Sequence, residues 1–338
     1  MTELHRGRHS VSFSKPPRIS AAAAVVGKKE AEGPLGHCFD IRAEDTKFGK
    51  NSWEQAESAM QTQALDTLLK KAGLTQDRIG AVFSGDLLNQ CIGSSFTLRN
   101  RGIPALGLYG ACSTMAESLI LAGAAVSGGF MDRAVAMTSS HFAAAERQYR
   151  FPLGYGGQRT PTSQWTVTGC GAALVTVHGT GPLLTGATVG TVVDGGIKDA
   201  NNMGAAMAPA ACETIKTHFD DLNRSPEDYD MILTGDLGTL GSSLLLELLE
   251  REGIRLRERH RDCGIMIYDI GPQDTHCGGS GCGCSAAVLC GHILDRLARG
   301  ELHRVLFCGT GALLSPLSTQ QGQSIPAVCH AVILEGEI

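Results

Sequence analysis

Aromatic and charged residues are scarce in this chain of 338 residues, and the shortage excludes several classes of protein. Aromatic residues make up 5% of the sequence and charged residues 19%, and the formal net charge of −5 leaves no basic excess for binding nucleic acid. The apolar runs are short and interrupted, so none resembles the run of about 20 apolar residues that spans a membrane. The basic N-terminus is followed by too brief an apolar segment for a signal peptide. We expect a protein without transmembrane helices that stays in a cytoplasm-like compartment and has no nucleic-acid partner.

Twelve cysteines are present, but they lack the spacing of a disulfide framework or of a zinc site. They are scattered through apolar segments, which predicts that most are reduced residues of the core. Cys277, Cys282 and Cys284 follow His276, yet the paired short spacings of a four-ligand zinc site are missing. We therefore expect no metal site and no cofactor.

Glycine is abundant, with 43 residues, and the sequence contains an internal repeat. A strand-like run ending in Gly-Asp-Leu at 78–87 returns at 228–237, so that Asp236 follows Asp86 by 150 residues. A second pattern, at 110–118, returns at 281–288 in the same order. Two copies at so long a period predict a duplicated α/β domain rather than a solenoid. We place its halves at residues 1–180 and 181–338.

Strand and helix patterns alternate in both halves, which is typical of parallel sheets covered by helices on both faces. The first half predicts strands at 19–26, 79–83, 104–109 and 134–138, a helix that Asn51 caps and Gly73 ends, and a helix at 113–125. Long strands at 166–177 and 185–193 predict a hairpin that closes this half. The second half predicts helices at 213–222, 244–252 and 285–298, and strands at 229–233, 265–268 and 305–308.

Cys112 lies where a predicted strand ends and a predicted helix begins, with small residues around it. A thiol at a helix N-terminus meets free N–H groups and a partial positive charge, which favour the thiolate. The position is therefore typical of a nucleophilic cysteine. A small apolar residue that fills a tight turn is the alternative reading.

Long and specific motifs are spread over nearly the whole chain. They are Glu32-Gly-Pro-Leu-Gly-His37, Ser84-Gly-Asp-Leu-Leu-Asn-Gln90, Tyr109-Gly-Ala-Cys-Ser-Thr114, Thr138-Ser-Ser-His141 with Ala145-Glu-Arg-Gln148, Met203 to Ala211, Thr234-Gly-Asp236, Gly278-Gly-Ser-Gly-Cys282 and Gly309-Thr-Gly-Ala-Leu-Leu-Ser-Pro316. With the strand-cysteine-helix element and the duplication, the chain resembles the thiolase superfamily of thiolases and ketoacyl synthases. More closely, it resembles the family of stage V sporulation protein AD of spore-forming bacteria.

This resemblance implies a five-layered αβαβα thiolase fold with two mixed sheets. It also implies a role in the uptake of pyridine-2,6-dicarboxylic acid (dipicolinate), alone or as its calcium chelate, into the developing spore. The implied partners are membrane-spanning stage V sporulation proteins, beside the inner spore membrane, and a second copy of the chain in a homodimer formed through the first half.

Condensing enzymes of this superfamily pair the cysteine with histidine and asparagine, or with two histidines, which stabilise an oxyanion. No asparagine follows Asn223, and the loop after the strand at 229–233 has no histidine. A cysteine-histidine-asparagine site therefore cannot form, although His276 and His330 leave a histidine-based variant open. We expect a receptor without chemistry. A thiolase-like acyltransferase that uses Cys112 is the alternative, and a structural scaffold with an empty pocket is a third.

A dianionic aromatic ligand needs donors for its carboxylates, and arginine is the usual one. Arg147 is favoured over Arg150, which we interpret as a solvated surface charge or a partner in a structural hydrogen bond. Asp236 is interpreted as a helix cap. The residues expected to bind the ligand are Asp86, Asn89, Cys112, Ser113, Ser140, His141 and Arg147.

Overall fold

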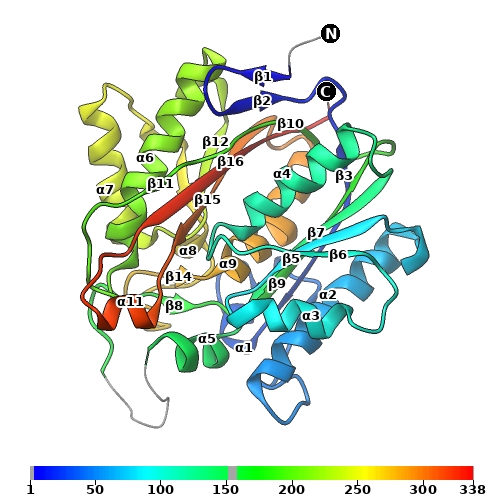
Figure 1. Ribbon diagram of the computed structural model, residues 1–338, viewed down its shortest axis with the longest axis horizontal. Coiled ribbons are helices and arrows are strands. Elements are labelled where there is room, and N and C mark those ends of the chain that lie inside the picture. Colours follow the sequence, from blue (N-terminus) through cyan, green and yellow to red (C-terminus); the bar gives the residue numbers. More distant parts are fainter. Residues whose placement is uncertain (1–3, 151–157, 338) are drawn as a thin grey trace.

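The computed structural model describes residues 4–150 and 158–337 and shows five layers of helices and sheets (Figure 1). In the first half, strands run in the order β3-β9-β7-β5-β6. Strand β5 is parallel to β6 and β7, and β9 is antiparallel to β3 and β7. The bounds are β3 (Arg18–Val26), β5 (Ala81–Gly85), β6 (Ala105–Gly107), β7 (Arg133–Ser140) and β9 (Gly169–Thr176).

The second half repeats this plan in the order β13-β12-β15-β16-β10. Strand β12 is parallel to β13 and β15, and β16 is antiparallel to β15 and β10. The bounds are β10 (Leu183–Thr188), β12 (Met231–Thr234), β13 (His260–Asp262), β15 (Arg304–Ala312) and β16 (Ala327–Glu335).

Helices form the two outer layers and the central one (Figure 1). Helices α2 (Trp53–Ala72) and α3 (Ile92–Leu98) cover the first sheet, and α6 (Met203–Leu222) and α7 (Gly238–Arg251) cover the second. Helix α4 (Thr114–Ser127) contacts β5 and β7 of one half and β15 and β16 of the other, and α9 (Cys282–Val288) lies beside it. The five-layered arrangement of helices and sheets expected from the sequence is confirmed.

Short elements complete the described chain. They are β1 (His5–Arg6), β2 (Ser10–Ser12), α1 (Lys28–Ala31), β4 (Ile41–Arg42), α5 (Phe142–Tyr149), β8 (Trp165–Thr166), β11 (Val192–Val193), α8 (Cys263–Met266), β14 (Gly279–Ser280), a π-helical turn (Leu289–Ile293), α10 (Leu294–Ala298) and α11 (Pro316–Gln320).

The predicted hairpin between 166–177 and 185–193 is wrong. Strands β9 and β10 are separated by β3, which pairs with β9 along its length and with β10 through Arg18 and Leu183. This pairing through β10 joins the two mixed sheets into one continuous hydrogen-bonded order. The boundary expected at residue 180 lies in the connection between β9 and β10.

Other predicted elements differ at their ends or in type. The strand expected at 265–268 is wrong, because α8 occupies 263–266 and the strand beside β12 is β13. Helix α2 is capped by Ser52, whose hydroxyl accepts from the backbone of Gln55, rather than by Asn51, and it ends at Gly73 with a φ of 62°. Helix α6 begins at Met203, ten residues before its predicted start, and contains Pro209. Strand β16 had no counterpart among the predictions.

Small residues allow the layers to approach closely, as the glycine content indicates. A Cβ atom on Gly171 of β9 would stand 2.2 Å from the carbonyl oxygen of Ala286 in α9. Glycine is therefore required where the central helix crosses the first sheet. All twelve cysteines are free thiols, and ten of them are buried. Within 4–150 and 158–337, no helix combines the length and apolar character needed to cross a bilayer.

Candidate functional site

Cys112 sits in a tight turn at the start of the central helix α4. Ala111 holds a left-handed φ of 51°, and the backbone N–H of Ser113 donates to the carbonyl of Gly110 at 3.1 Å. The Ser113 hydroxyl donates to the same carbonyl at 2.7 Å. A non-glycine residue with positive φ is uncommon and costs energy, so the surrounding structure must hold this turn in place.

The second half supplies that support through β15. A Cβ atom on Gly311 would stand 2.3 Å from the carbonyl oxygen of Gly110, and one on Gly309 would stand 3.0 Å from the carbonyl oxygen of Ser113. Only a strand without side chains at these two positions can pack directly on the turn that presents Cys112. The two halves therefore build the site together.

Asp236 follows β12 and lies close enough to Cys112 for its carboxylate to act on the pKa of the thiol. The Asp236 carboxylate accepts from the backbone N–H of Gly281 at 2.9 Å and from the hydroxyl of Thr310 at 2.8 Å. Thr310 lies within β15 and Gly281 directly precedes α9, so both partners of the carboxylate come from the second half. Asp236 thus places an acidic group beside the sulfur, whereas stabilisation of an oxyanion needs hydrogen-bond donors.

Burial and mutual proximity set the protonation of this pair. Burial first, and the neighbouring Asp236 carboxylate second, hold the pKa of Cys112 well above its ordinary value. Burial raises the pKa of Asp236 from 3.8 to about 7, although the thiol and Gly281 oppose that rise. Cys112 is therefore a neutral thiol near neutral pH, despite its place at a helix N-terminus.

The histidines that could have completed a thiolase site make their contacts elsewhere. His276 Nδ1 lies 2.6 Å from the carbonyl oxygen of Thr160, and His330 Nδ1 accepts from the backbone N–H of Gly190 at 3.1 Å. No histidine of the described chain lines the pocket at Cys112 or forms a hydrogen bond with its sulfur.

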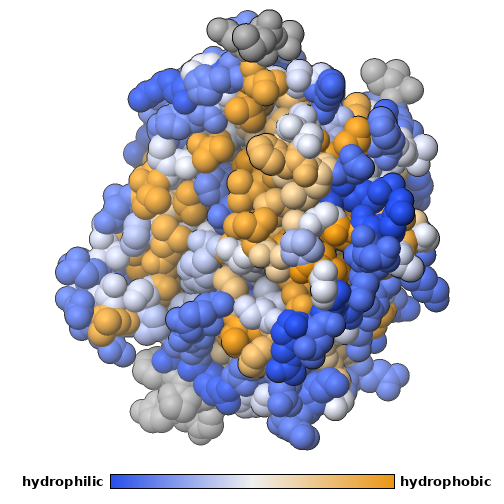
Figure 2. All heavy atoms as spheres, turned by 45° about the vertical axis from the view of Figure 1, so that its right-hand side comes forward, coloured by the Kyte–Doolittle hydropathy of each residue, from blue (hydrophilic) through white to orange (hydrophobic). Residues whose placement is uncertain are grey.

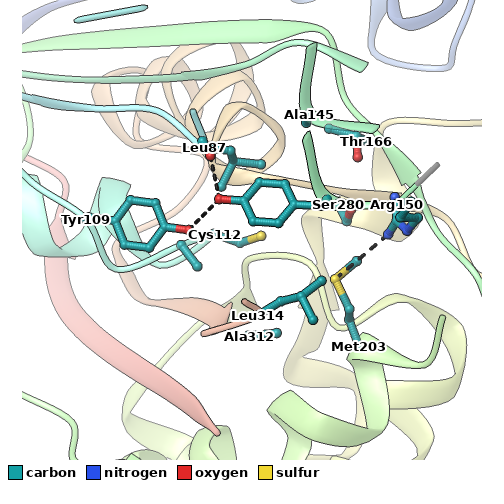
Figure 3. A pocket seen from close by; sticks show the side chains of 12 residues that line it. Leu87, Tyr109, Cys112, Ala145, Arg150, Thr166, Met203, Ser280, Ala312 and Leu314 are labelled. Atoms are coloured by element: carbon teal, nitrogen blue, oxygen red, sulfur yellow. Dashed lines mark hydrogen bonds between the residues drawn. The ribbon is translucent and has the colours of Figure 1, made fainter. Parts of the chain in front are cut away.

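A pocket opens at Cys112 (Figure 3). In Figure 3, Tyr109 and Cys112 lie on one side of the pocket, and Arg150 and Met203 on the other. The lining residues are Leu87, Tyr109, Ala111, Cys112, Ala145, Tyr149, Arg150, Thr166, Met203, Ser280, Ala312 and Leu314.

Two tyrosines form one wall of this pocket. The hydroxyls of Tyr109 and Tyr149 are 2.6 Å apart, and the Tyr149 hydroxyl donates to the carbonyl of Leu87 at 2.5 Å. Burial raises the pKa of both phenols, so both are neutral. The wall therefore offers aromatic faces and one uncharged hydroxyl pair to a ligand.

Of the seven residues expected to bind the ligand, Cys112 alone lines this pocket. Asp86 is fully buried and caps α3, because its carboxylate accepts from the backbone N–H of Ser94 at 2.8 Å and of Leu88 at 3.0 Å. Asn89 and Arg147 line a separate surface depression. Arg147 there pairs with Glu54.

The other predicted residues, Ser113, Ser140 and His141, make hydrogen bonds within the protein and do not line the pocket. Ser113 holds the turn, and the Ser140 hydroxyl donates to the carbonyl of Val167 at 2.7 Å and accepts from the backbone N–H of Gly283 at 3.2 Å. His141 is buried with its Nε2 atom 2.6 Å from the carbonyl oxygen of Thr46, and burial lowers its pKa.

Asp236 does not cap α7, so this interpretation was wrong. The cap comes from Asp262, whose carboxylate accepts from the backbone N–H groups of Leu237 at 2.8 Å and Gly238 at 3.0 Å. Sequence reasoning also missed Tyr149, Arg150 and Met203 as pocket residues. Their signal was present in the motif segments around 145–148 and 203–211, but it did not show which side chains face Cys112.

The cysteine-rich loop beside His276 forms separate contacts. Cys282 Sγ donates to the carbonyl of Ser139 at 2.9 Å, and Cys284 Sγ lies 3.8 Å from the carbonyl oxygen of Gly235. Across the described residues, no three histidine, cysteine or acidic side chains are arranged to hold a metal ion.

A duplicated, helix-covered sheet with a cysteine at the head of the central helix defines a thiolase-like protein. AbyA1, a tetronic acid condensing enzyme, shares this fold with a TM-score of 0.58 and 19% identity, over 95% of this chain and 100% of that one. The 3-oxoacyl-[acyl-carrier-protein] synthase III of Aquifex aeolicus VF5 gives a TM-score of 0.55 and 13% identity, over 94% of this chain and 99% of that one. Identities this low show the fold alone.

A family model described as Stage V sporulation protein AD (SpoVAD) matches residues 7–335. The Stage V sporulation protein AD of Bacillus subtilis (strain 168) is 45% identical over 329 residues, which cover 97% of each chain. The chain belongs to the SpoVAD family and is a sporulation protein of thiolase-like fold.

Proposed function

We propose that this protein binds dipicolinate, or its calcium chelate, at the Cys112 pocket for uptake into the developing spore, and that it performs no thiolase chemistry. The observation that carries the proposal is the buried carboxyl group of Asp236 beside the Cys112 thiol, in a pocket that no histidine of the described residues lines. A condensing enzyme needs a thiolate and neutral donors that stabilise an oxyanion. A carboxylate beside the sulfur opposes both requirements, because it disfavours the thiolate and repels a developing negative charge.

The character of the pocket supports a flat, partly apolar ligand. Its walls carry the tyrosine pair together with apolar side chains such as Leu87, Ala312 and Leu314. Arg150 is the only cationic side chain that lines it in the described residues. A pyridine ring with carboxylates at its edge matches this combination of aromatic faces and one positive charge.

Calorimetric titration with dipicolinate, in the absence and presence of calcium, tests the proposal. We expect saturable binding that Cys112→Ala weakens, because the substitution changes the floor of the pocket. Cys212→Ala is the matched control, since Cys212 is half-buried in α6 and does not line the pocket. The absence of any heat of binding at millimolar dipicolinate would refute the proposed ligand.

A thiolase-like acyltransferase is the second candidate, and the fold of the condensing enzymes favours it. Cys112 also keeps the strand-to-helix turn expected of a nucleophile. Against this candidate stand the raised pKa of Cys112 and the absence of a histidine lining the described pocket.

The exposed edge of the first sheet supports a homodimer. Strand β6 ends the strand order, pairs with β5 on one side, and exposes all three of its residues. Figure 2, which brings this side of the molecule forward, shows an apolar area down the middle of the face. The exposed side chains of Phe96, Leu106 and Leu121 belong to α3, β6 and α4. A second copy that pairs its own β6 across a twofold axis would satisfy the free edge and cover these side chains.

The proposed role in a membrane complex rests on the family resemblance alone. In this proposal the protein delivers dipicolinate to a channel whose spanning subunits are other stage V sporulation proteins, beside the inner spore membrane. Co-purification of these proteins with the tagged chain from sporulating cells is the expected result.

A further inference from the structure

Arg150 brings a nearly buried guanidinium group to the pocket. It follows α5 directly, its side chain is 15% exposed, and it lines the cavity opposite Cys112 (Figure 3). The Nη1 atom pairs with Glu146 one helical turn earlier. Glu146 is itself fixed by the hydroxyl of Thr166, which donates to its carboxylate at 3.0 Å. These contacts hold the guanidinium group at its Nη1 atom.

The other edge of the guanidinium group lacks a good acceptor. The Nε atom is buried and has no hydrogen-bond partner in the described part of the chain. The Nη2 atom contacts the thioether sulfur of Met203 at 4.0 Å, and a thioether is a weak acceptor. A buried donor on a charged group that lacks an acceptor is unfavourable, and such groups in native proteins are rare.

Nε and Nη2 lie on one edge of the guanidinium plane and donate in nearly parallel directions. A carboxylate accepts from such a pair through both of its oxygens, which makes the contact strong and specific in geometry. We infer that Arg150 binds a carboxylate group of the ligand through this edge, with Met203 beside it. The inference rests on the proposed function and identifies the residue that selects a carboxylate.

Arg147 contrasts with Arg150 although the two are three residues apart. Its side chain is 49% exposed, pairs with Glu54, and lies over the ring of Trp53 at 5.3 Å. Its guanidinium group thus has partners outside the pocket. The last turn of α5 therefore offers Arg147 to the surface, and the residue that follows the helix, Arg150, to the ligand.

The ligand class follows from the rest of the wall. The tyrosine pair and the apolar side chains accept a flat ring, and the Arg150 edge accepts one carboxylate on it. A neutral amide offers one carbonyl oxygen and no negative charge, so it makes a weaker contact with this edge than the two oxygens of a carboxylate do. The pocket should therefore prefer an aromatic carboxylate to its amide.

The test is a calorimetric titration of the full chain with four ligands: dipicolinate, pyridine-2-carboxylate, benzoate and the neutral pyridine-2-carboxamide. We expect Arg150→Gln to weaken the binding of each carboxylate by at least about tenfold. Arg150→Lys should recover little of the lost affinity, because the point charge of lysine cannot make the paired contact. Arg251→Gln is the control, since Arg251 pairs with Glu247 on the surface of α7.

The outcomes separate this inference from the proposed function. If the unchanged protein binds dipicolinate and Arg150→Gln binds it equally well, the inference fails and the proposed function stands. A larger loss in Arg147→Gln than in Arg150→Gln, or equal affinity for the amide and the acid, also overturns the inference. Binding of benzoate or pyridine-2-carboxylate but not of dipicolinate would refute the proposed ligand. The effect of Arg150→Gln on the carboxylate that does bind would then decide the inference about Arg150. If no carboxylate binds, both fail. Circular dichroism shows whether each variant folds, and Arg150→Lys keeps the test available if Arg150→Gln does not.

Discussion

Replacing Asp236 with asparagine should make Cys112 more reactive. The substitution keeps the size of the side chain and can retain the acceptor for Gly281, but it removes the negative charge beside the sulfur. Two unit charges about 4 Å apart interact by about 4 kcal/mol at an effective dielectric constant near 20. One pKa unit corresponds to about 1.4 kcal/mol, so the full effect on the thiol is at most about three units. Burial remains, and Asp236 is only partly ionised near pH 7, so we expect a fall in the Cys112 pKa of at least about one unit.

The assay is the rate of alkylation by iodoacetamide between pH 7 and pH 10, measured at each cysteine by peptide mass spectrometry. A fall of one unit gives about tenfold more thiolate at a fixed pH below the pKa. Cys212 of the same sample is the internal control, because it lies in α6 and does not contact Asp236. Equal rates at Cys112 in the parent and in a folded Asp236→Asn protein would refute the electrostatic account of the site.

Three further predictions follow from the same structure. Because the pKa of Asp236 is raised from 3.8 to about 7, its contribution to stability is fully present below about pH 3.8 and is lost as pH rises through about 7. In urea unfolding, the free energy of unfolding of Asp236→Asn should therefore rise relative to that of the parent protein by up to about 4 kcal/mol between pH 4 and pH 8. A difference between the two proteins that does not change with pH would contradict this. Gly311→Ala should lower the free energy of unfolding by about 2 kcal/mol or more, because its Cβ atom would overlap the Cys112 turn, whereas Gly271→Ala, with open space around it, should change it little. Leu106→Asp should convert a dimer into a monomer in light scattering, whereas Leu317→Asp, also exposed, should not; a monomeric parent protein would refute the proposed interface.

The order of strands and helices could be predicted because it depends on local patterns. Buried strands such as 79–83 and the helix after Cys112 carry clear periodicity and clear ends. The run at 265–268 carries a short apolar pattern that suits a strand or a helix equally. Asp262 favours the helix here, because its side chain accepts from the backbone N–H of Ile265 and caps α8. The prediction of a hairpin was wrong for another reason: β3, which comes from much earlier in the chain, lies between β9 and β10 in the sheet.

The composition of the site depends on contacts that a local pattern does not contain. Asp236 suits a helix cap by position, but its partner Cys112 comes from the other half of the chain. Arg147 and Arg150 belong to the same helical segment, and the docking of α5 decides which of them reaches the pocket. Cys112 could be found because a strand, a small-residue turn and a helix surround it in sequence.

The most direct test of the central claim is intact-mass spectrometry of the purified protein after incubation with acyl-coenzyme A, with and without dipicolinate. The account predicts an unmodified protein, because a neutral thiol beside a carboxylate is a poor nucleophile. An acyl adduct that maps to Cys112, whether or not dipicolinate is present, would contradict the account and favour the acyltransferase.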